Sequence, residues 1–207
     1  MKRQSMVLAA IATLGLAVAI PMTLAHRSMT APSASMKQHG EGMHHGGMMH
    51  EMRVSSEFEY LSQMIPHHQE AIDTAKIVLA RSDRPEMKAF AMDIIRVQTV
   101  EIEQMRQWLS EWYPEQDMTA DYTPMMRDLE NLQGNALDQA FLEDMVMHHM
   151  GAIMMSRMLL NQNLVEHEPV RPFAQQIAST QGEEIQQMQA WLKEWFGVAG
   201  SMPGMQH

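Results

Sequence analysis

Cysteine is absent from this 207-residue sequence. Disulfides, thiolate zinc sites, iron–sulfur clusters and cysteine nucleophiles are therefore excluded. Basic residues are also few, because 15 Lys and Arg stand against 25 Asp and Glu. A surface that binds nucleic acid needs clustered Lys and Arg, so we expect no nucleic-acid partner. The sequence also lacks a nucleophile elbow, a phosphate-binding loop and a dinucleotide fingerprint, and we expect no enzymatic turnover.

Long hydrophobic runs are limited to one short segment near the N-terminus. Met6–Ile20 is an uncharged apolar run that follows Lys2 and Arg3, and the small residue Ala25 comes after it. A membrane span needs about 20 apolar residues, whereas this layout is typical of a secretory signal peptide. We predict a cleaved signal peptide at residues 1–25, with an uncleaved anchor as the alternative. The mature protein would be periplasmic or secreted, without stable membrane insertion.

Methionine and histidine are unusually frequent for a protein of this length, with 25 Met and 11 His. Many of them lie between His26 and Arg53, a glycine-rich stretch with few large branched side chains. Such a stretch cannot bury a core, and His-rich tracts are typical of metal binding. We predict a flexible metal-capturing arm at residues 26–54, rather than an ordinary linker, and a flexible tail at residues 198–207. The candidate ligands in the arm are His44, His45, Met48, Met49 and His50.

The remainder of the chain has helical periodicity and contains an internal repeat. Met64–Ile72 returns as Met145–Ile153, and Glu101–Trp112 returns as Glu184–Trp195. Each half is a helical hairpin that could not cover its apolar face alone. No stretch shows sustained period-two alternation, so we expect no sheet. The sequence predicts an all-α four-helix bundle at residues 55–197.

Capping and helix-breaking residues divide this bundle. The expected parts are repeat one at residues 55–113, a linker at residues 114–134 and repeat two at residues 135–197. Ser56 and Glu59 have the spacing of a capping box that opens the first helix. Within the linker, Pro124–Leu132 followed by Gly134 predicts a short helix with a glycine cap.

Ionisable and sulfur-bearing side chains interrupt the apolar seams of all four helices. The candidate interior set is Met64, His67, His68, Glu101 and Met105, with its repeat Met145, His148, His149, Glu184 and Met188. A buried imidazole or carboxylate must be paired, hydrogen-bonded or metal-bound, because its desolvation is costly. One interpretation is therefore a His–Glu pair in a Met-filled core, and the other is a metal site. The presence of the whole set in both halves favours the metal site.

The ligand types indicate which metal. Di-iron bundles use Glu-x-x-His motifs, but here a thioether replaces the carboxylate in Met64-x-x-His67 and Met145-x-x-His148. Soft thioethers shift the preference from iron or manganese toward Cu(I) or Ag(I), whereas Cu(II) favours imidazoles and carboxylates. Copper ions are therefore the predicted ligand, with silver as a second candidate. Further candidate ligands at helical steps are Met147, Met150 and Met154, for which core packing or partner binding is the alternative.

The Met-x-x-His-His and Glu-x-x-x-Met-x-x-Trp motifs of both halves resemble the ferritin-like domain of unknown function 305 family, which includes CopM-like periplasmic copper-binding proteins. The resemblance covers about residues 55–196. It implies a ferritin-like bundle that binds Cu(I), and Cu(II) as well, in copper resistance, buffering or trafficking. A periplasmic copper exporter or acceptor protein is the candidate partner. By position, the resemblance places the ligands at the interior set.

Two other functions stay open at this point. A copper-dependent redox enzyme, similar to a cuprous oxidase, would consume oxygen catalytically, which a copper buffer would not. A Met-rich module that binds partner helices would keep its partner after chelation of all metal. The leading hypothesis is a copper-binding protein without turnover.

Overall fold

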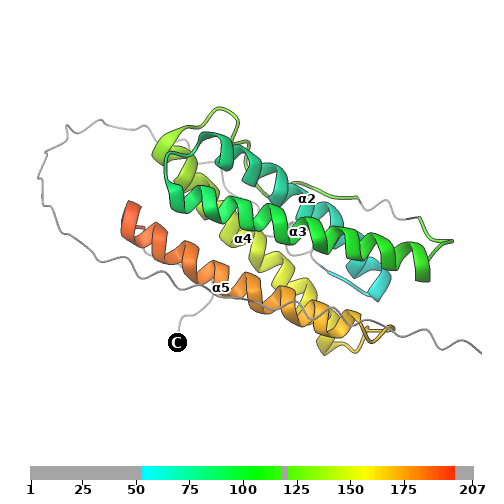
Figure 1. Ribbon diagram of the computed structural model, residues 1–207. Helices are drawn as coiled ribbons and strands as arrows, with labels where there is room; N and C mark the ends of the chain where they lie inside the picture. The colour runs from blue at the N-terminus through cyan, green and yellow to red at the C-terminus, as the bar shows by residue number, and fades with distance from the viewer. Residues whose placement is uncertain (1–52, 118–120, 199–207) are drawn as a thin grey trace, which may run out of the picture. The chain divides into compact units, whose positions relative to one another are not determined.

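The computed structural model describes residues 53–117 and 121–198. The predicted signal peptide, the arm ligands from His44 to His50 and nearly all of the predicted tail lie outside these residues. The described chain forms four helices and no strand: α2 (Glu57–Arg81), α3 (Pro85–Trp112), α4 (Gly134–Asn161) and α5 (Val170–Phe196) (Figure 1). None of these helices is long and apolar enough to cross a membrane. The predicted all-α fold is confirmed.

The four helices pack as two hairpins. α2 packs against α3, α4 packs against α5, and the hairpins meet through α2 and α4 (Figure 1). Tyr60 and Leu61, near the start of α2, share a core cluster with Leu159, near the end of α4. The two central helices therefore run antiparallel. Neither hairpin covers its apolar face alone, so each supplies the other's core.

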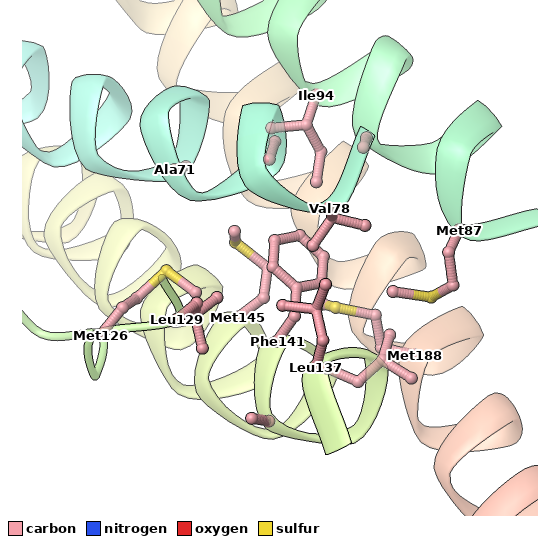
Figure 2. Close-up of a cluster of buried hydrophobic side chains, with 14 of the residues drawn as sticks. Ala71, Val78, Met87, Ile94, Met126, Leu129, Leu137, Phe141, Met145 and Met188 are labelled. Atoms are coloured by element: carbon pink, nitrogen blue, oxygen red, sulfur yellow. The ribbon is translucent and has the colours of Figure 1, made fainter. Parts of the chain in front are cut away.

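Two apolar clusters fill the two ends of the bundle. The Tyr60 cluster contains Tyr60, Leu61, Met64, Met105, Leu109, Met155 and Leu159. The Phe141 cluster contains Val78, Met87, Phe141, Leu142, Met145, Met188 and Leu192, and Figure 2 shows Met145 and Met188 beside the Phe141 ring. Tyr60 and Phe141 occupy equivalent positions of the repeat, 81 residues apart. The internal repeat is therefore also a repeat of packing.

The helix ends follow from local hydrogen bonds, with one exception to the predicted pattern. Ser56 Oγ accepts from the Glu59 amide at 3.1 Å, as a capping box requires, but the Glu59 carboxylate accepts from the Ser55 amide at 2.8 Å rather than from Ser56. At the other end of the chain, Gly197 has a φ of 68°. Glycine reaches this left-handed conformation without steric cost and ends α5.

The short helix predicted at Pro124–Leu132 is wrong. The segment is irregular, and Gly134 is the first residue of α4 rather than a C-terminal cap. The reason is a side chain from α2: the Glu70 carboxylate accepts from the amides of Met125 at 2.8 Å and Met126 at 2.9 Å. A carboxylate from another helix holds these amides, which therefore start no helix of their own.

Buried carboxylates tie the hairpins together at the two ends of the bundle. Glu57 of α2 is fully buried and accepts from the amides of Glu166 at 2.7 Å and His167 at 3.0 Å, in the loop before α5. Nδ1 of the His167 ring donates to the same carboxylate at 2.7 Å. At the equivalent place in the other half, Asp138 lies 3.2 Å from Arg84 Nε. Both ties cross from one hairpin to the other.

Removal of the Glu57 tie tests its contribution to stability. Glu57→Ala leaves the partly buried amides of Glu166 and His167 without their acceptor, and we expect a loss of about 1–3 kcal/mol in the free energy of unfolding, measured with urea. The matched control is Glu86→Ala, in the first turn of α3, where the side chain is exposed. We expect the control to change stability by less than about 0.5 kcal/mol. If both substitutions changed the free energy of unfolding equally, the Glu57 hydrogen bonds would not stabilise the contact between the hairpins.

Candidate metal centre

Four buried imidazoles lie where α2 and α4 meet. This histidine layer consists of His67 and His68 on α2 with His148 and His149 on α4, and none of the four is more than 1% exposed. The rings of His67 and His148 lie against each other across the interface, with centroids 3.7 Å apart and their planes tilted by 31°. Within each helix the neighbouring rings are 6.1 and 6.3 Å apart. The two hairpins therefore meet through imidazoles in the middle of an otherwise apolar interface.

The helical turn directs the two histidines of each pair to different neighbours. Successive residues point about 100° apart around a helix, so His67 faces α4 while His68 faces α3. His68 Nε2 lies 2.9 Å from Glu101 Oε2, and His149 Nε2 lies 2.7 Å from Glu184 Oε2. Each hairpin thus contains one internal His–Glu pair. The other histidine of each hairpin, His67 or His148, lies at the contact between α2 and α4.

Several ring nitrogens of the histidine layer have no hydrogen-bond partner in the structure. They are both nitrogens of His67, both nitrogens of His148, and the Nδ1 atoms of His68 and His149. A neutral imidazole carries one donor and one acceptor, and each buried polar group without a partner costs about 1–3 kcal/mol. These atoms are therefore available to a bound ligand, and a metal ion is the ligand that imidazole nitrogens commonly take.

A carboxylate from α2 approaches the layer on one side only. Glu70 Oε2 lies 3.3 Å from His148 Nε2. The same carboxylate accepts from the Tyr122 hydroxyl and from the amides of Met125 and Met126. Burial would raise the pKa of Glu70, but hydrogen bonds from His148, Tyr122 and the Met126 amide outweigh it and lower this pKa. Glu70 therefore stays ionised beside His148.

The imidazoles at the interface are held neutral. Burial lowers the pKa of His67 well below its ordinary value, and the neighbouring His148, His68 and His149 lower it further. Burial also lowers the pKa of His148 to about 4, although its contact with Glu70 acts in the opposite direction. Imidazole must be neutral to bind a metal. Both rings therefore keep their ligand form in mildly acidic solution.

Buried thioethers lie one helical turn from the layer on both sides. Met64 and Met105 belong to the Tyr60 cluster, and Met145 and Met188 belong to the Phe141 cluster. All four are fully buried. The histidine layer is therefore placed between two pairs of sulfur atoms, one pair from each hairpin.

The remaining predicted residues are less enclosed. Glu184 keeps about 20% of its side chain exposed, and Glu101 about 11%. Met147, Met150 and Met154 are partly buried, and Met150 packs at the edge of the Phe141 cluster. Across the described ranges, no three His, Asp or Glu side chains converge into a group that could hold a metal by themselves.

The structure adds three polar residues that the sequence reasoning missed. Gln98 and Gln181 are 2% and 3% exposed and lie three residues before Glu101 and Glu184. Their 83-residue separation repeats that of the glutamates, so the signal was present in the sequence. Glu70 gave no such signal, because Gly151 occupies its equivalent position in the second half.

The depressed histidine pKa values predict how the metal-free protein responds to acid. The unfolded chain protonates His67 and His148 near their ordinary pKa of 6.5, whereas the folded chain does so only at lower pH. The unfolded state therefore binds more protons between about pH 6.5 and 4, and the free energy of unfolding falls as the pH drops through this window. We expect a loss of roughly 4 kcal/mol between about pH 7.5 and 5 in urea unfolding, because each of the two groups contributes about 1.4 kcal/mol per pH unit below its unfolded pKa.

The control for this prediction is His148→Gln, which keeps a polar side chain and removes one titrating group. Its stability should fall with pH about half as steeply as that of the unchanged protein. If the free energy of unfolding of the unchanged protein were the same at both pH values, the neutral state of His67 and His148 would be contradicted.

Comparison with known proteins supports the same fold. The structure resembles CopM in the Cu(I)-bound form, with 32% sequence identity and a TM-score of 0.62 over 70% of this chain and 100% of that chain. It resembles CopM in an Ag-bound form at 31% identity with a TM-score of 0.61, over 70% and 100% of the two chains. A DUF305 fragment from Deinococcus radiodurans matches at 28% identity with a TM-score of 0.60, over 68% and 97%.

The family comparison covers the bundle. No curated protein sequence matches the chain significantly. The family model described as a domain of unknown function, DUF305, matches residues 57–192 and again residues 138–206. The two matches together include all four helices and their repeated histidine motifs. The chain belongs to the DUF305 family.

Proposed function

We propose that this protein binds copper in the middle of its helical bundle and carries it as cargo, without catalytic turnover. Its place of action would be the periplasm or the outside of the cell, in copper resistance, buffering or trafficking. The observation that carries the proposal is the set of unpartnered imidazole nitrogens placed between two pairs of buried thioethers. Solved structures of CopM with bound Cu(I), Cu(II) and silver support it.

The ligand chemistry favours the reduced ion. Thioethers are soft ligands that select Cu(I) over hard divalent ions. The described His, Asp and Glu side chains form no three-member group for a metal, so a site made of these groups alone is not favoured. Imidazole nitrogens completed by Met64 and Met105, or by Met145 and Met188, give a soft mixed set in each hairpin. Ag(I) shares this preference and serves as a redox-inert probe.

Cu(II) would use the harder groups of the same region. The pairs His68–Glu101 and His149–Glu184 each combine an imidazole with a carboxylate that still reaches solvent. Such groups suit Cu(II) better than thioethers do. We propose these pairs as the weaker Cu(II) ligands, and the Met/His-rich segment before the bundle as a separate capturing arm.

A methionine substitution separates metal ligation from packing. Replacement of Met105 and Met188 by Leu keeps the volume and removes only sulfur, so the stability of the metal-free protein should change by less than about 1.5 kcal/mol for each. We expect the double variant to lose most of the rise in melting temperature that Cu(I) gives, because only a ligand bound to the folded state stabilises it. The measurement is thermal unfolding with and without Cu(I).

The matched control replaces one buried methionine in each cluster away from the histidine layer. Met87→Leu with Met155→Leu should keep the full copper-induced shift, since Met87 and Met155 are equally buried. If Cu(I) raised the melting temperature of the Met105 and Met188 double variant as much as that of the unchanged protein, those methionines would serve core packing and would not be ligands.

The arm is tested by deletion. Removal of residues 26–53 should lower the number of Cu(I) ions bound per chain, while the helix content and the tightest site stay intact. The readouts are metal content after dialysis and far-ultraviolet circular dichroism. If the deletion unfolds the bundle, the arm contributes to the structure and the proposed separation of roles is wrong.

A further inference from the structure

A small cavity lies between α3 and α5, next to the carboxylates that pair with the histidine layer. Its polar lining includes Gln98 and Glu101 from α3 with Gln181 and Glu184 from α5. Its volume is about 10 Å³, close to what one water-sized sphere needs. The cavity can therefore hold one water molecule or one small ion.

The two glutamines lack a hydrogen-bond partner where they face this cavity. The Oε1 atoms of Gln98 and Gln181 are buried and unpartnered. These two amide oxygens accept hydrogen bonds or bind cations but cannot donate. Together with two carboxylates, they give the cavity an acceptor-rich lining, which suits a cation. The two halves of the repeat each contribute one glutamine and one glutamate to this single cavity, at equivalent positions.

The carboxylates beside the cavity connect solvent with the histidine layer. The imidazoles are at most 1% exposed, and the rings of His67 and His148 lie against each other where α2 meets α4. Glu101 and Glu184 keep part of their side chains in solvent, and each contacts a histidine through its Oε2 atom. These carboxylates therefore span the distance from the surface to the layer.

We propose that this cavity is the portal through which a copper-type cation reaches the interior, with Gln98 and Gln181 as its gate. The inference rests on the proposed copper-binding function. Oxygen ligands hold Cu(I) and Ag(I) more weakly than sulfur does. A portal needs ligands that attract the ion and release it again. The cation is first held by the amide and carboxylate oxygens and then passes to the imidazoles and thioethers, without any redox step.

The test compares the rate of metal loading with the affinity at equilibrium. Gln98→Leu with Gln181→Leu removes both acceptors and fills the cavity with methyl groups. Ag(I) is mixed rapidly with the full chain, and tryptophan fluorescence is followed, because all four tryptophans belong to α3 and α5 and report on the bundle alone. We expect loading and release to slow by the same factor of about ten, which corresponds to about 1.4 kcal/mol of barrier. The affinity and the number of bound ions should stay the same.

Two further variants make the test specific. Gln107→Leu with Gln187→Leu changes exposed residues of the same two helices and should leave both rates unchanged. Gln98→Glu adds an acceptor charge to the cavity and should speed up loading, an effect of opposite sign, while the helix content and the melting temperature without metal exclude a loosened bundle as its cause.

The possible results separate the portal from the proposed function. Loading rates of the double leucine variant equal to those of the unchanged chain, with silver still bound, would overturn the portal and leave copper binding intact. A loss of affinity with faster release would overturn the portal as well, because it would make the glutamines ligands of the final site. No silver binding by the unchanged bundle would overturn the proposed function and the portal together.

Discussion

The structure depends on the burial of four imidazoles at the contact between α2 and α4. Burial removes these rings from water, which keeps His67 and His148 neutral and leaves ring nitrogens without partners. An apolar pair of side chains at these positions would avoid that cost. The rest of the bundle is arranged around this layer: each hairpin supplies one His–Glu pair, and an apolar cluster closes each end. A bound soft cation is what would offset the cost.

The two halves are equivalent in outline but not in detail. Glu70 approaches His148, whereas glycine at the equivalent position leaves His67 without a carboxylate neighbour. The Tyr60 hydroxyl of α2 lies 3.0 Å from Ser156 Oγ of α4, whereas the equivalent positions of the repeat hold Phe141 and Ala75, which cannot form such a contact. Two sites built from the same motif would therefore differ in charge and in affinity. The Glu70 carboxylate also accepts hydrogen bonds from backbone amides of the linker. A cation that displaces this carboxylate would therefore change the conformation of the linker.

The sequence predicted the fold and the interior set because the signal was repeated. Histidine within an apolar seam, seen twice at one spacing, indicates an interface rather than chance, and the His–Glu pairs follow from the facing seams. The irregular linker could not be predicted, because its amides are held by Glu70, which is 55 and 56 residues away along the chain. The ties of Glu57 and Asp138 were missed for the same reason: their partners lie in loops that only the assembled bundle brings near.

The central claim is that the histidine layer, with the methionines beside it, holds the metal. Anomalous X-ray scattering from silver, in crystals of the silver-loaded protein, tests it most directly. The account predicts silver peaks between the imidazoles of the layer and the sulfur atoms of Met64 and Met105, or of Met145 and Met188. Silver found only at the protein surface, with the four imidazoles still in contact only with one another and with Glu70, Glu101 and Glu184, would contradict it.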